Sequence, residues 1–533
     1  MKLTGFLFAA ALLGACTQAA EENYTRHVDP KIGTGGHGHV FVGANVPFGL
    51  VQVGPTSIPQ TWDWCSGYHA SDSTVIGFSH THLSGTGIGD LFDVTVMPVT
   101  GDVTYARGEE ADPASGLWSY ADRTQEIARP GYYSVPLTRY GIRAELTATA
   151  RVGLHRYTFP ASDAAAVVFD LENGGCWDKA TETHLAKEGD RTVTGWRHST
   201  GWAKDQRVYF AAEFSKPFEK FETIGDNYAR ASFRTTDGEQ VSLKVALSPV
   251  SVEGAKANLA AELSGWDFEE TAAAADKAWN DELSKVKIET EDETSKRIFY
   301  TALYHTMVAP SLFCDVNGDY RGADGKVHEN PGRDTYTTFS LWDTYRAAMP
   351  LMTVLHPERM PDIIQTMLHI ADEQGRLPVW HLWGNETDCM VGNPGIVAVA
   401  DAIVKDIPGF DREKAFEAIR KTAMNPDRGN GLRMEYGYIP CEMFNEAVAY
   451  DMEYALADGA AARAAETLGK AEDAKYFEER SHSYRNYFDP QTGFMRGRDS
   501  KKGWRTPFNA FASTHRADDY CEGNAWQYTW LAP

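Results

Sequence analysis

The sequence predicts a multidomain protein in which an antiparallel β-sandwich is followed by a helical domain. Apolar and polar residues alternate over 144–154 and again over 241–247, which is the period of a half-buried strand. Farther along, Phe299, Leu303 and Met307 form an apolar stripe at helical spacing. We therefore expect a β-sandwich over 28–265, a helical linker over 266–290, and a helical domain over 291–533.

Other segments of the first half support the sandwich. The runs 164–171 and 207–214 are short and strongly apolar, as expected for buried strands. Turn residues separate the runs, and no regular alternation of strands and helices indicates a parallel sheet.

The second half reads as an array of helical hairpins. The first helix contains the 299–307 stripe and should stop at Pro310. Pro350 should kink the next helix, and Gly375 should end the one after it. The predicted helices that follow the first lie near 340–355, 361–374, 394–406, 411–425, 445–468 and 471–487.

Composition excludes two classes of protein. Hydrophobic residues make up 43% of the chain and aromatic residues 12%, which is typical of a globular protein rather than a disordered one. The net charge is −23, so a nucleic acid partner is not expected, because binding of nucleic acid needs a basic surface. The acidic balance is compatible with a neutral or cationic ligand, or with a soluble acidic surface alone.

The first twenty residues read as an export signal. Lys2 precedes an apolar run from Leu3 to Leu13, which is too short to span a bilayer and ends in Leu-Gly-Ala-Cys. This pattern is similar to a bacterial lipoprotein signal, in which Cys16 would carry the lipid. The alternative is ordinary secretion with cleavage near Ala19 and Ala20. Both place the protein outside the cytoplasm; the first anchors it in the periplasm or at the outer membrane, with no other membrane attachment expected.

Six further cysteines follow Cys16, and none belongs to a CxxC pair, so a zinc site is not expected. Export permits disulfides, but the sequence leaves their pairing open.

Two glycine-rich segments near the N-terminus carry paired histidines. The segment 33–38 formally matches GxGxxG, but glycines and a proline follow where a dinucleotide site needs a helix. The pairs His37/His39 and His80/His82 could ligate a metal from one face of a strand, or could hydrogen-bond in a site built from loops. We expect the second, with His80 and His82 binding substrate.

Between these segments, 62–69 is dense in aromatic and polar groups. Sugars are bound by aromatic faces together with hydrogen-bonding side chains, so Trp64 is a candidate substrate-binding residue. A tryptophan cluster in the core is the alternative.

Similar groups recur at helix ends in the second half. The candidate binding residues are Trp342, Asp343, Arg346, Asn385, Glu386 and Asp388. Asp343 and Arg346 could instead form an ion pair three residues apart on a helix.

Near the end of the chain, 521–528 combines a carboxylate, two amides and two aromatic residues. Gly523 should permit a turn that presents Glu522 to a cavity with aromatic walls. Such walls would remove water from the carboxyl group and keep it protonated, as a general acid requires. The alternative is a surface glutamate before a helix that begins at Asn524.

Taken together, these stretches resemble glycoside hydrolase family 92, the calcium-dependent exo-α-mannosidases of bacteria, with the α-1,2 type the expected one. The resemblance is carried by 29–39, 46–49, 65–69, 77–89, 340–346, 384–389 and 522–528. It implies a β-sandwich, a helical linker and an (α/α)6 toroid, with the active site between the domains. It also implies hydrolysis of terminal α-linked mannose from glycans with inversion of configuration.

The resemblance makes Glu522 the general acid and calcium the cofactor. Its calcium ligands remain unassigned, although Asn524 and Gln527 lie near the expected place. The family's general base belongs to a later motif rich in Gly, Asn and Asp, which this sequence lacks. We therefore expect a C-terminally truncated toroid with little or no turnover, in which Asp343, Glu386 and Asp388 serve sugar binding or structure.

Two other functions remain open at this stage. One is a related toroid enzyme, such as a phosphorylase or a trehalase-like hydrolase, against which the 77–89 motif speaks. The other is a carbohydrate-binding surface lipoprotein without turnover. Release of mannose from an α-mannoside would separate these, whereas glycosidic linkage and oligomeric state cannot be read from the sequence.

Overall fold

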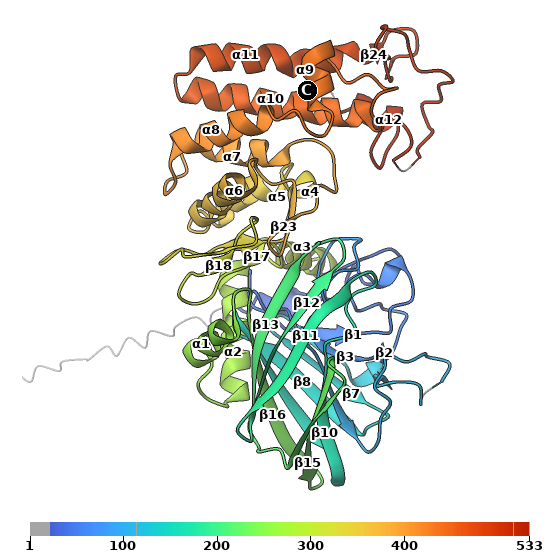
Figure 1. The fold of residues 1–533 in the computed structure, drawn as a ribbon, viewed down its shortest axis with the longest axis vertical. Helices are drawn as coiled ribbons and strands as arrows, with labels where there is room; N and C mark the ends of the chain where they lie inside the picture. Colours follow the sequence, from blue (N-terminus) through green and yellow to red (C-terminus); the bar gives the residue numbers. More distant parts are fainter. Residues whose placement is uncertain (1–21, 113, 515, 532–533) are drawn as a thin grey trace, which may run out of the picture.

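The computed structural model describes residues 22–531 except 113 and 515. Figure 1 shows the β-sandwich at one end of the molecule and the helical domain stacked on it at the other. The predicted fold class is therefore confirmed. Cys16 and the rest of the predicted signal lie outside the described residues. Among the described helices, none is long and apolar enough to cross a membrane.

Two antiparallel sheets form the sandwich. In spatial order, one contains β1 (Gly54–Thr56), β3 (Gly77–Ser79), β4 (Thr95–Thr100), β10 (Ser162–Asp170), β15 (Tyr228–Thr235) and β14 (Lys220–Ile224). The other contains β11 (Lys179–Glu188), β12 (Thr192–Thr200), β13 (Gln206–Phe214), β16 (Glu239–Ser248), β9 (Val152–Phe159), β8 (Ile142–Ala148), β7 (Tyr132–Leu137) and β6 (Ile127–Arg129). The core lies between them, where Phe169 stacks on Phe210 and Phe159 meets Phe233 edge-on.

The alternating segment 144–154 is a hairpin rather than one half-buried strand. β8 ends at Ala148 and β9 begins at Val152, and most residues of both strands are buried. The turn between them is held from outside the sheet, because Arg151 donates to Glu262 at 2.8 Å and to the Cys314 carbonyl at 2.7 Å. Helix α2 (Phe268–Leu283) packs on β8, so the face of β8 that was expected to meet water is covered.

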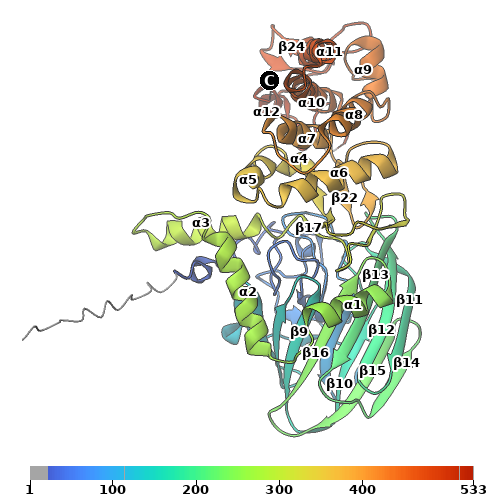
Figure 2. The ribbon, with the colours of Figure 1, turned by 90° about the vertical axis from the view of Figure 1, so that its left-hand side faces the viewer.

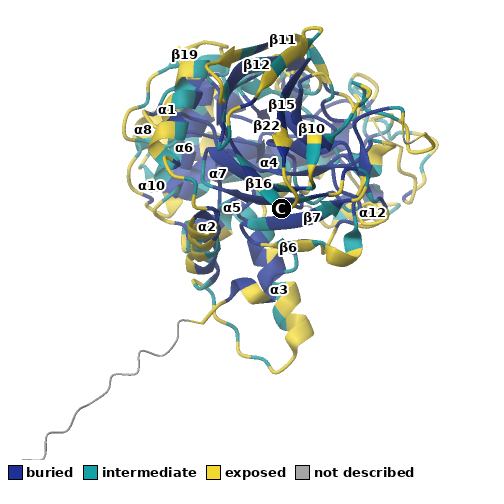
Figure 3. Cartoon of the chain, turned by 90° about the horizontal axis from the view of Figure 1, so that it is seen from below, coloured by how far each residue is buried: buried dark blue, intermediate teal, exposed yellow. Residues whose placement is uncertain are grey.

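Two helices follow the last strand of the sandwich, and only the second lies in the predicted linker 266–290. Helix α1 (Val252–Glu262) was not expected; it follows the last sandwich strand, and Ser251 caps its N-terminus. Helix α2 (Phe268–Leu283) is capped by Asp267 and runs along the sandwich in Figure 2. Helix α3 (Glu293–His305) projects from the body, with much of its surface exposed in Figure 3, and it ends before Pro310.

Small β elements connect the two domains and fasten loops in both. They are β2 (Thr74–Val75) with β5 (Ser119–Tyr120), β17 (Ser311–Leu312) with β20 (Tyr336–Thr337), β18 (Tyr320–Arg321) with β19 (Val327–His328), β21 (Phe339–Ser340) with β22 (Trp380–Leu382) and β23 (Asn385–Glu386), and β24 (Phe488–Asp489) with β25 (Phe494–Met495).

The helical domain is built from pairs of packed helices. Its members are α4 (Leu341–Thr344), α5 (Ala348–Leu355), α6 (Met360–Gln374), α7 (Pro394–Val404), α8 (Arg412–Ala423), α9 (Asn430–Tyr436), α10 (Ala447–Thr467), α11 (Ala471–Ser481) and α12 (Ala525–Thr529). Helix α10 packs on α7, α8 and α11, and α6 packs on α7 and α8.

Local signals placed most of these helices correctly, and two places differ. The helix expected at 340–355 is interrupted at 345–347, and Pro350 lies in the first turn of α5, where no backbone N–H donor is needed. The short helix α9 was missed. Gly375 ends α6 in the left-handed conformation, as predicted.

Polar groups inside the sandwich are paired with one another. The fully buried Arg197 donates to Asp93 at 2.7 Å and to Asp178 at 2.9 Å. His80 donates from Nδ1 to the Val94 carbonyl at 2.6 Å, and its Nε2 lies 2.9 Å from Nε2 of His155. These networks satisfy groups whose unpaired burial would be costly.

The buried histidines predict a loss of stability in mild acid. Burial lowers the pKa of His80 to about 3 and of His82 to about 4 from the usual 6.5. Between pH 6.5 and the folded-state pKa, these histidines are therefore protonated in the unfolded chain and neutral in the folded chain. At pH 5 each histidine should cost about 2 kcal/mol of folding free energy. Asp90 and Asp315, whose pKa burial raises to about 6, add stability over the same interval, so the histidine loss is measured as the difference between wild type and a histidine variant in urea denaturation at pH 7.5 and pH 5.

The variant His82→Gln should flatten this pH dependence by about 2 kcal/mol, whatever its effect at neutral pH. The matched control is His37→Gln, because the His37 side chain is 81% exposed and its variant should keep the wild-type slope. Equal slopes in His82→Gln and wild type would rule out this origin of acid sensitivity.

Candidate active site

A cavity of about 480 Å³ lies where the sandwich meets the helical domain. Its wall from the sandwich consists of Trp62, Gly85, Thr86, Gly87, Ile88 and Trp202, and its wall from the helical domain consists of Asp343, Trp380, Cys389, Met390, Arg516, Cys521 and Glu522. Three tryptophans and two carboxylates thus face one space. Trp202 and Trp380 meet edge-on across the junction, with ring centroids 4.4 Å apart.

Glu522 is presented by a tight turn before α12. Its own φ is +45°, so the strained residue is the glutamate, whereas the prediction placed the unusual conformation at Gly523. Gly523 is needed for space instead, because a Cβ there would lie 3.0 Å from Gln527 Oε1. Asn524 and Gln527 form a reciprocal capping box that starts α12.

The Glu522 side chain is exposed, which differs from the prediction of a dehydrated carboxyl group. The turn is nevertheless fixed on both sides, because Tyr528 donates its hydroxyl to the Cys521 carbonyl at 2.8 Å. Glu522 therefore has a defined backbone and a side chain open to a ligand.

Asp343, at the start of the helical domain, is the second carboxylate of the cavity. Burial raises its pKa, and the negative charge of Glu522 raises it further, while Arg346 opposes both. The effect of Glu522 on Asp343 places the two carboxyl groups within electrostatic reach of each other. Two neighbouring carboxyl groups with different exposure can hold different protonation states, which suits acid–base chemistry.

Trp342 and Arg346 do not line this cavity. Both donate to Oε1 of Glu453 on α10, Trp342 at 3.2 Å and Arg346 at 2.5 Å. Tyr345 donates to the other carboxylate oxygen at 2.7 Å. These contacts fasten α4 to α10 and so hold Asp343 in place. The Arg346 guanidinium therefore hydrogen-bonds to Glu453 and does not form the alternative ion pair with Asp343.

The loop 385–388 supports the cavity wall from behind. Asn385 exchanges two hydrogen bonds with the Asp205 backbone of the sandwich, at 3.1 and 3.0 Å. Glu386 accepts backbone N–H groups of Val379 and Trp380 at 2.8 and 2.9 Å. Neither side chain is part of the cavity lining.

Asp388 lies at a neighbouring hollow. It pairs with Arg376 at 2.5 Å and with Arg428 at 3.4 Å. It lines a second cavity, of about 810 Å³, which shares Trp202, Cys389 and Arg516 with the first.

The candidates from the sandwich lie away from the cavity. His80 is fully buried, and His82 donates to the Gln52 carbonyl at 2.8 Å and is 3% exposed, so both are interior residues rather than ligand-binding ones. Trp64 donates to Asp72 at 2.7 Å and stacks on His69, so its ring is also occupied. Its neighbour Trp62 lines the cavity instead.

Two family models match nearly all of the chain. Residues 27–248 match the N-terminal domain of glycosyl hydrolase family 92, and residues 254–533 match the catalytic domain of that family. The chain belongs to glycosyl hydrolase family 92.

Solved family 92 structures superpose on the chain over most of its length. A family GH92 α-mannosidase from Bacteroides thetaiotaomicron, solved with mannoimidazole, is 39% identical with a TM-score of 0.93, over 96% of this chain and 71% of that one. A family GH92 inverting mannosidase from the same organism is 29% identical with a TM-score of 0.86, over the same shares. An uncharacterized secreted glycosidase from Arthroderma benhamiae is 26% identical over 558 residues, which are 94% of this chain and 67% of that protein.

The family 92 cavity contains residues that the sequence did not single out. Trp202 stands in the turn between β12 and β13, where a tryptophan between two strands is a usable signal. Trp380 and Met390 are the two ends of the segment 380–390, from which the sequence favoured Asn385, Glu386 and Asp388. Arg516 offers no sequence signal, because nothing near it has the pattern of a helix or strand.

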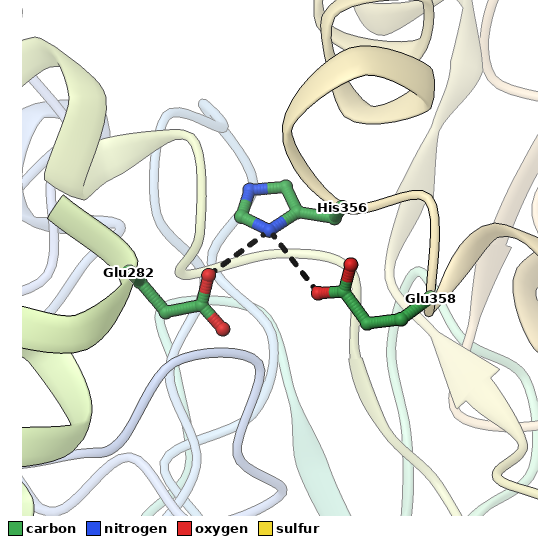
Figure 4. A group of neighbouring side chains, drawn as sticks. All are labelled: Glu282, His356 and Glu358. Carbon is green, nitrogen blue, oxygen red and sulfur yellow. Dashed lines mark ion pairs between the residues drawn. The ribbon is translucent and has the colours of Figure 1, made fainter. Parts of the chain in front are cut away.

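Membership of family 92 directs attention to calcium, and the described residues contain one three-residue group that could hold a metal. Glu282, His356 and Glu358 present ligand atoms within 4.8 Å of one another (Figure 4). Nδ1 of His356 lies 3.1 Å from Glu282 and 4.0 Å from Glu358. The group joins α2 to the connection between α5 and α6.

This group does not fit calcium, because Lys285 already supplies its cation. The Lys285 ammonium lies 2.7 Å from Glu282, 2.9 Å from Glu358 and 3.2 Å from Nδ1 of His356. Calcium also prefers oxygen ligands to imidazole nitrogen. Burial opposes ionisation of Glu282, but hydrogen bonds from His356 and Lys285 outweigh it and lower its pKa to about 2. The cluster is a network of ion pairs that joins the linker to the helical domain.

Proposed function

We propose that this family 92 protein is an exo-acting α-mannosidase that hydrolyses terminal α-linked mannose from glycans. The observation that supports it best is the placement of Glu522 and Asp343 in one cavity with Trp62, Trp202 and Trp380. A volume of about 480 Å³ is in the range of small-ligand sites. Aromatic walls suit the C–H faces of a sugar, and carboxylates suit its hydroxyl groups. The aligned relatives described as mannosidases support the choice of mannose.

Glu522 is proposed as the general acid, which protonates the departing glycosidic oxygen. Its exposed carboxyl group on a fixed turn is accessible to a substrate that enters the cavity. Hydrolysis with inversion then needs a second carboxylate on the opposite face, about 6.5–9.5 Å from the acid, to activate water. The relative described as an inverting mannosidase supports this stereochemistry.

Asp343 is proposed to bind the sugar rather than to act as the base. Its carboxyl group is held from behind by the Trp342, Tyr345 and Arg346 contacts to Glu453, which fix a hydrogen-bond acceptor in the cavity wall. If mannoside hydrolysis persists when Asp343 and Glu522 are the only carboxylates in the site, Asp343 would be the general base.

Calcium dependence and export are proposed on family grounds. Calcium, when bound, would polarise sugar hydroxyl groups. Among the described residues, the one group of three side chains that could hold a metal already pairs with Lys285. Export through the 1–20 segment, with Cys16 as lipid anchor in the periplasm or outer membrane, agrees with the description of the Arthroderma relative as secreted.

Substitution of Glu522 tests the acid role. In a chain that also carries the general base, Glu522→Gln keeps the size of the side chain and removes the transferable proton, so kcat/KM on an α-mannosyl disaccharide should fall about 10²–10⁴-fold. Loss on an aryl mannoside with a good leaving group should be smaller, because that leaving group needs no proton. Release of mannose is the measurement, and Glu479→Gln, on the exposed side of α11, is the control.

Equal losses on both substrates would show that Glu522 is not the acid. Retention of a mannoside without release of mannose, in a chain that also carries the general base, would contradict the enzyme proposal and favour a sugar-binding protein.

Removal of calcium gives a second test. Exhaustive EGTA treatment should abolish most mannoside hydrolysis, and added Ca²⁺ should restore it. Thermal stability should change little, because the Glu282–His356–Glu358 cluster keeps its Lys285 partner without a metal. Full activity in EGTA would refute calcium dependence.

Metabolic labelling tests the anchor. A bacterial host fed radioactive palmitate should label the wild type, and Cys16→Ala should lose the label. Retention of the label in that variant would exclude lipid attachment at Cys16.

A further inference from the structure

Two cysteines from distant parts of the sequence meet at the edge of the cavity. Cys65 closes the turn that starts at Trp62, with its backbone N–H donating to the Trp62 carbonyl at 3.2 Å. Cys176 lies in the loop between β10 and β11, and its Sγ lies 3.8 Å from the carbonyl oxygen of Thr61. Each thiol shifts the pKa of the other, and the contact with Thr61 places Cys176 beside the turn that ends at Cys65. Both are reduced in this structure.

The two loops differ in how firmly they are held. The Cys176 loop is anchored by Asp178, which pairs with the fully buried Arg197, and by the Trp177 N–H, which donates to the Gly89 carbonyl at 3.0 Å. The turn that contains Cys65 carries Trp62, whose side chain is 49% exposed and lines the cavity. Its ring is held by one hydrogen bond, from Nε1 to the Gly87 carbonyl at 2.8 Å.

We propose that Cys65 and Cys176 form a disulfide that ties the turn carrying Trp62 to the anchored loop of Cys176. The oxidant is a small or protein disulfide of the thiol-exchange class, which an oxidising compartment supplies. Each closure consumes one oxidant disulfide and yields two oxidant thiols, so two electrons and two protons leave the cysteine pair.

The surroundings of the two cysteines indicate which thiol reacts first with the oxidant. The hydrogen bond from Cys65 lowers the pKa of Cys176, burial opposes this, and the charge of Arg107 assists it. Cys176 is half-buried and therefore reachable, so its thiolate attacks the oxidant, forms a mixed disulfide and expels one thiol. The buried Cys65, whose pKa is raised, then attacks the Cys176 sulfur and expels the second thiol.

The disulfide should act on substrate binding more than on chemistry. It joins residues far apart in the chain, so it should also raise the Tm. With the link intact, the Trp62 turn is fixed to the ion-paired interior around Arg197. Without it, the ring is held by the Trp62–Gly87 hydrogen bond, by the local turn and by its contacts with His37 and His39.

Oxidation of the full chain with oxidised glutathione tests the proposal. Peptide mapping without reductant should recover a Cys65–Cys176 linked peptide, the number of titratable thiols should fall by two, and the Tm should rise. Cys65→Ser and Cys176→Ser should each lose the linked peptide and the rise in Tm. Cys441→Ser is the matched control, since Cys441 is buried in a separate cluster with Ile439 and Tyr454.

Wild-type protein in which both cysteines stay alkylatable after oxidation would overturn the proposal, as would linkage of either one to a different cysteine. If Cys65→Ser fails to fold because Cys65 is buried, the half-buried Cys176 gives the same test alone.

A second readout rests on the proposed mannosidase function, whereas the peptide map does not. Cys176→Ser should raise KM for a mannoside by up to about tenfold with kcat unchanged, because a loosened wall weakens binding without removing the acid. A linked peptide in the wild type together with an unchanged KM in the variant would overturn the link between the disulfide and Trp62.

Discussion

The cavity depends on the contact between the sandwich and the helical domain, because neither domain encloses it alone. Trp202 comes from the β12–β13 hairpin and Trp380 from β22, and their rings meet at the junction. Just behind them, Asn385 and the Asp205 backbone exchange two hydrogen bonds. A shift between the domains would separate the tryptophans before it disturbed either core, so these contacts determine whether the cavity exists.

Acidic side chains of the helical domain fall into two groups according to what neutralises them. Glu386, Asp388 and Glu453 are paired with arginine side chains or backbone N–H groups and hold loops and helices together. Asp343 and Glu522 face the cavity, and the pKa of Asp343 is raised by burial and by the charge of Glu522. A carboxylate already engaged by fixed donors has little capacity left for a substrate, which separates structural from functional residues.

The sandwich supports this site through an unusually polar interior. Tyr157, His155 and His80 form a hydrogen-bonded chain that ends at the Val94 carbonyl, which fixes the tautomer of each imidazole. The Asp93–Arg197–Asp178 cluster lies close to the strand ends and loops that approach the cavity. Satisfied buried networks permit one arrangement of the strands, so they position the loops at the edge of the cavity.

Local patterns in the sequence determined much of this fold. Alternation at 241–247 and the apolar runs at 164–171 and 207–214 became strands, and most helices began and ended near their predicted residues. Such patterns predict correctly because the period of apolar residues depends on which side of an element is buried. Gly375 ends α6 and Asn524 starts α12 through contacts with residues adjacent in the chain. The motif residues Asp343 and Glu522 were likewise found, since their immediate sequence surroundings are distinctive.

The tertiary structure decided which side chains meet the cavity. Trp62 rather than Trp64 lines it, because the hydrogen bond to Gly87 directs one ring outward while Asp72 and His69 hold the other. Arg346 hydrogen-bonds to Glu453. The 144–154 segment is divided by a turn in which Arg151 hydrogen-bonds to Glu262. Each outcome depends on a partner far away in the chain. A side chain with two possible partners follows the one that folding brings within hydrogen-bond distance, and sequence spacing carries no record of that distance.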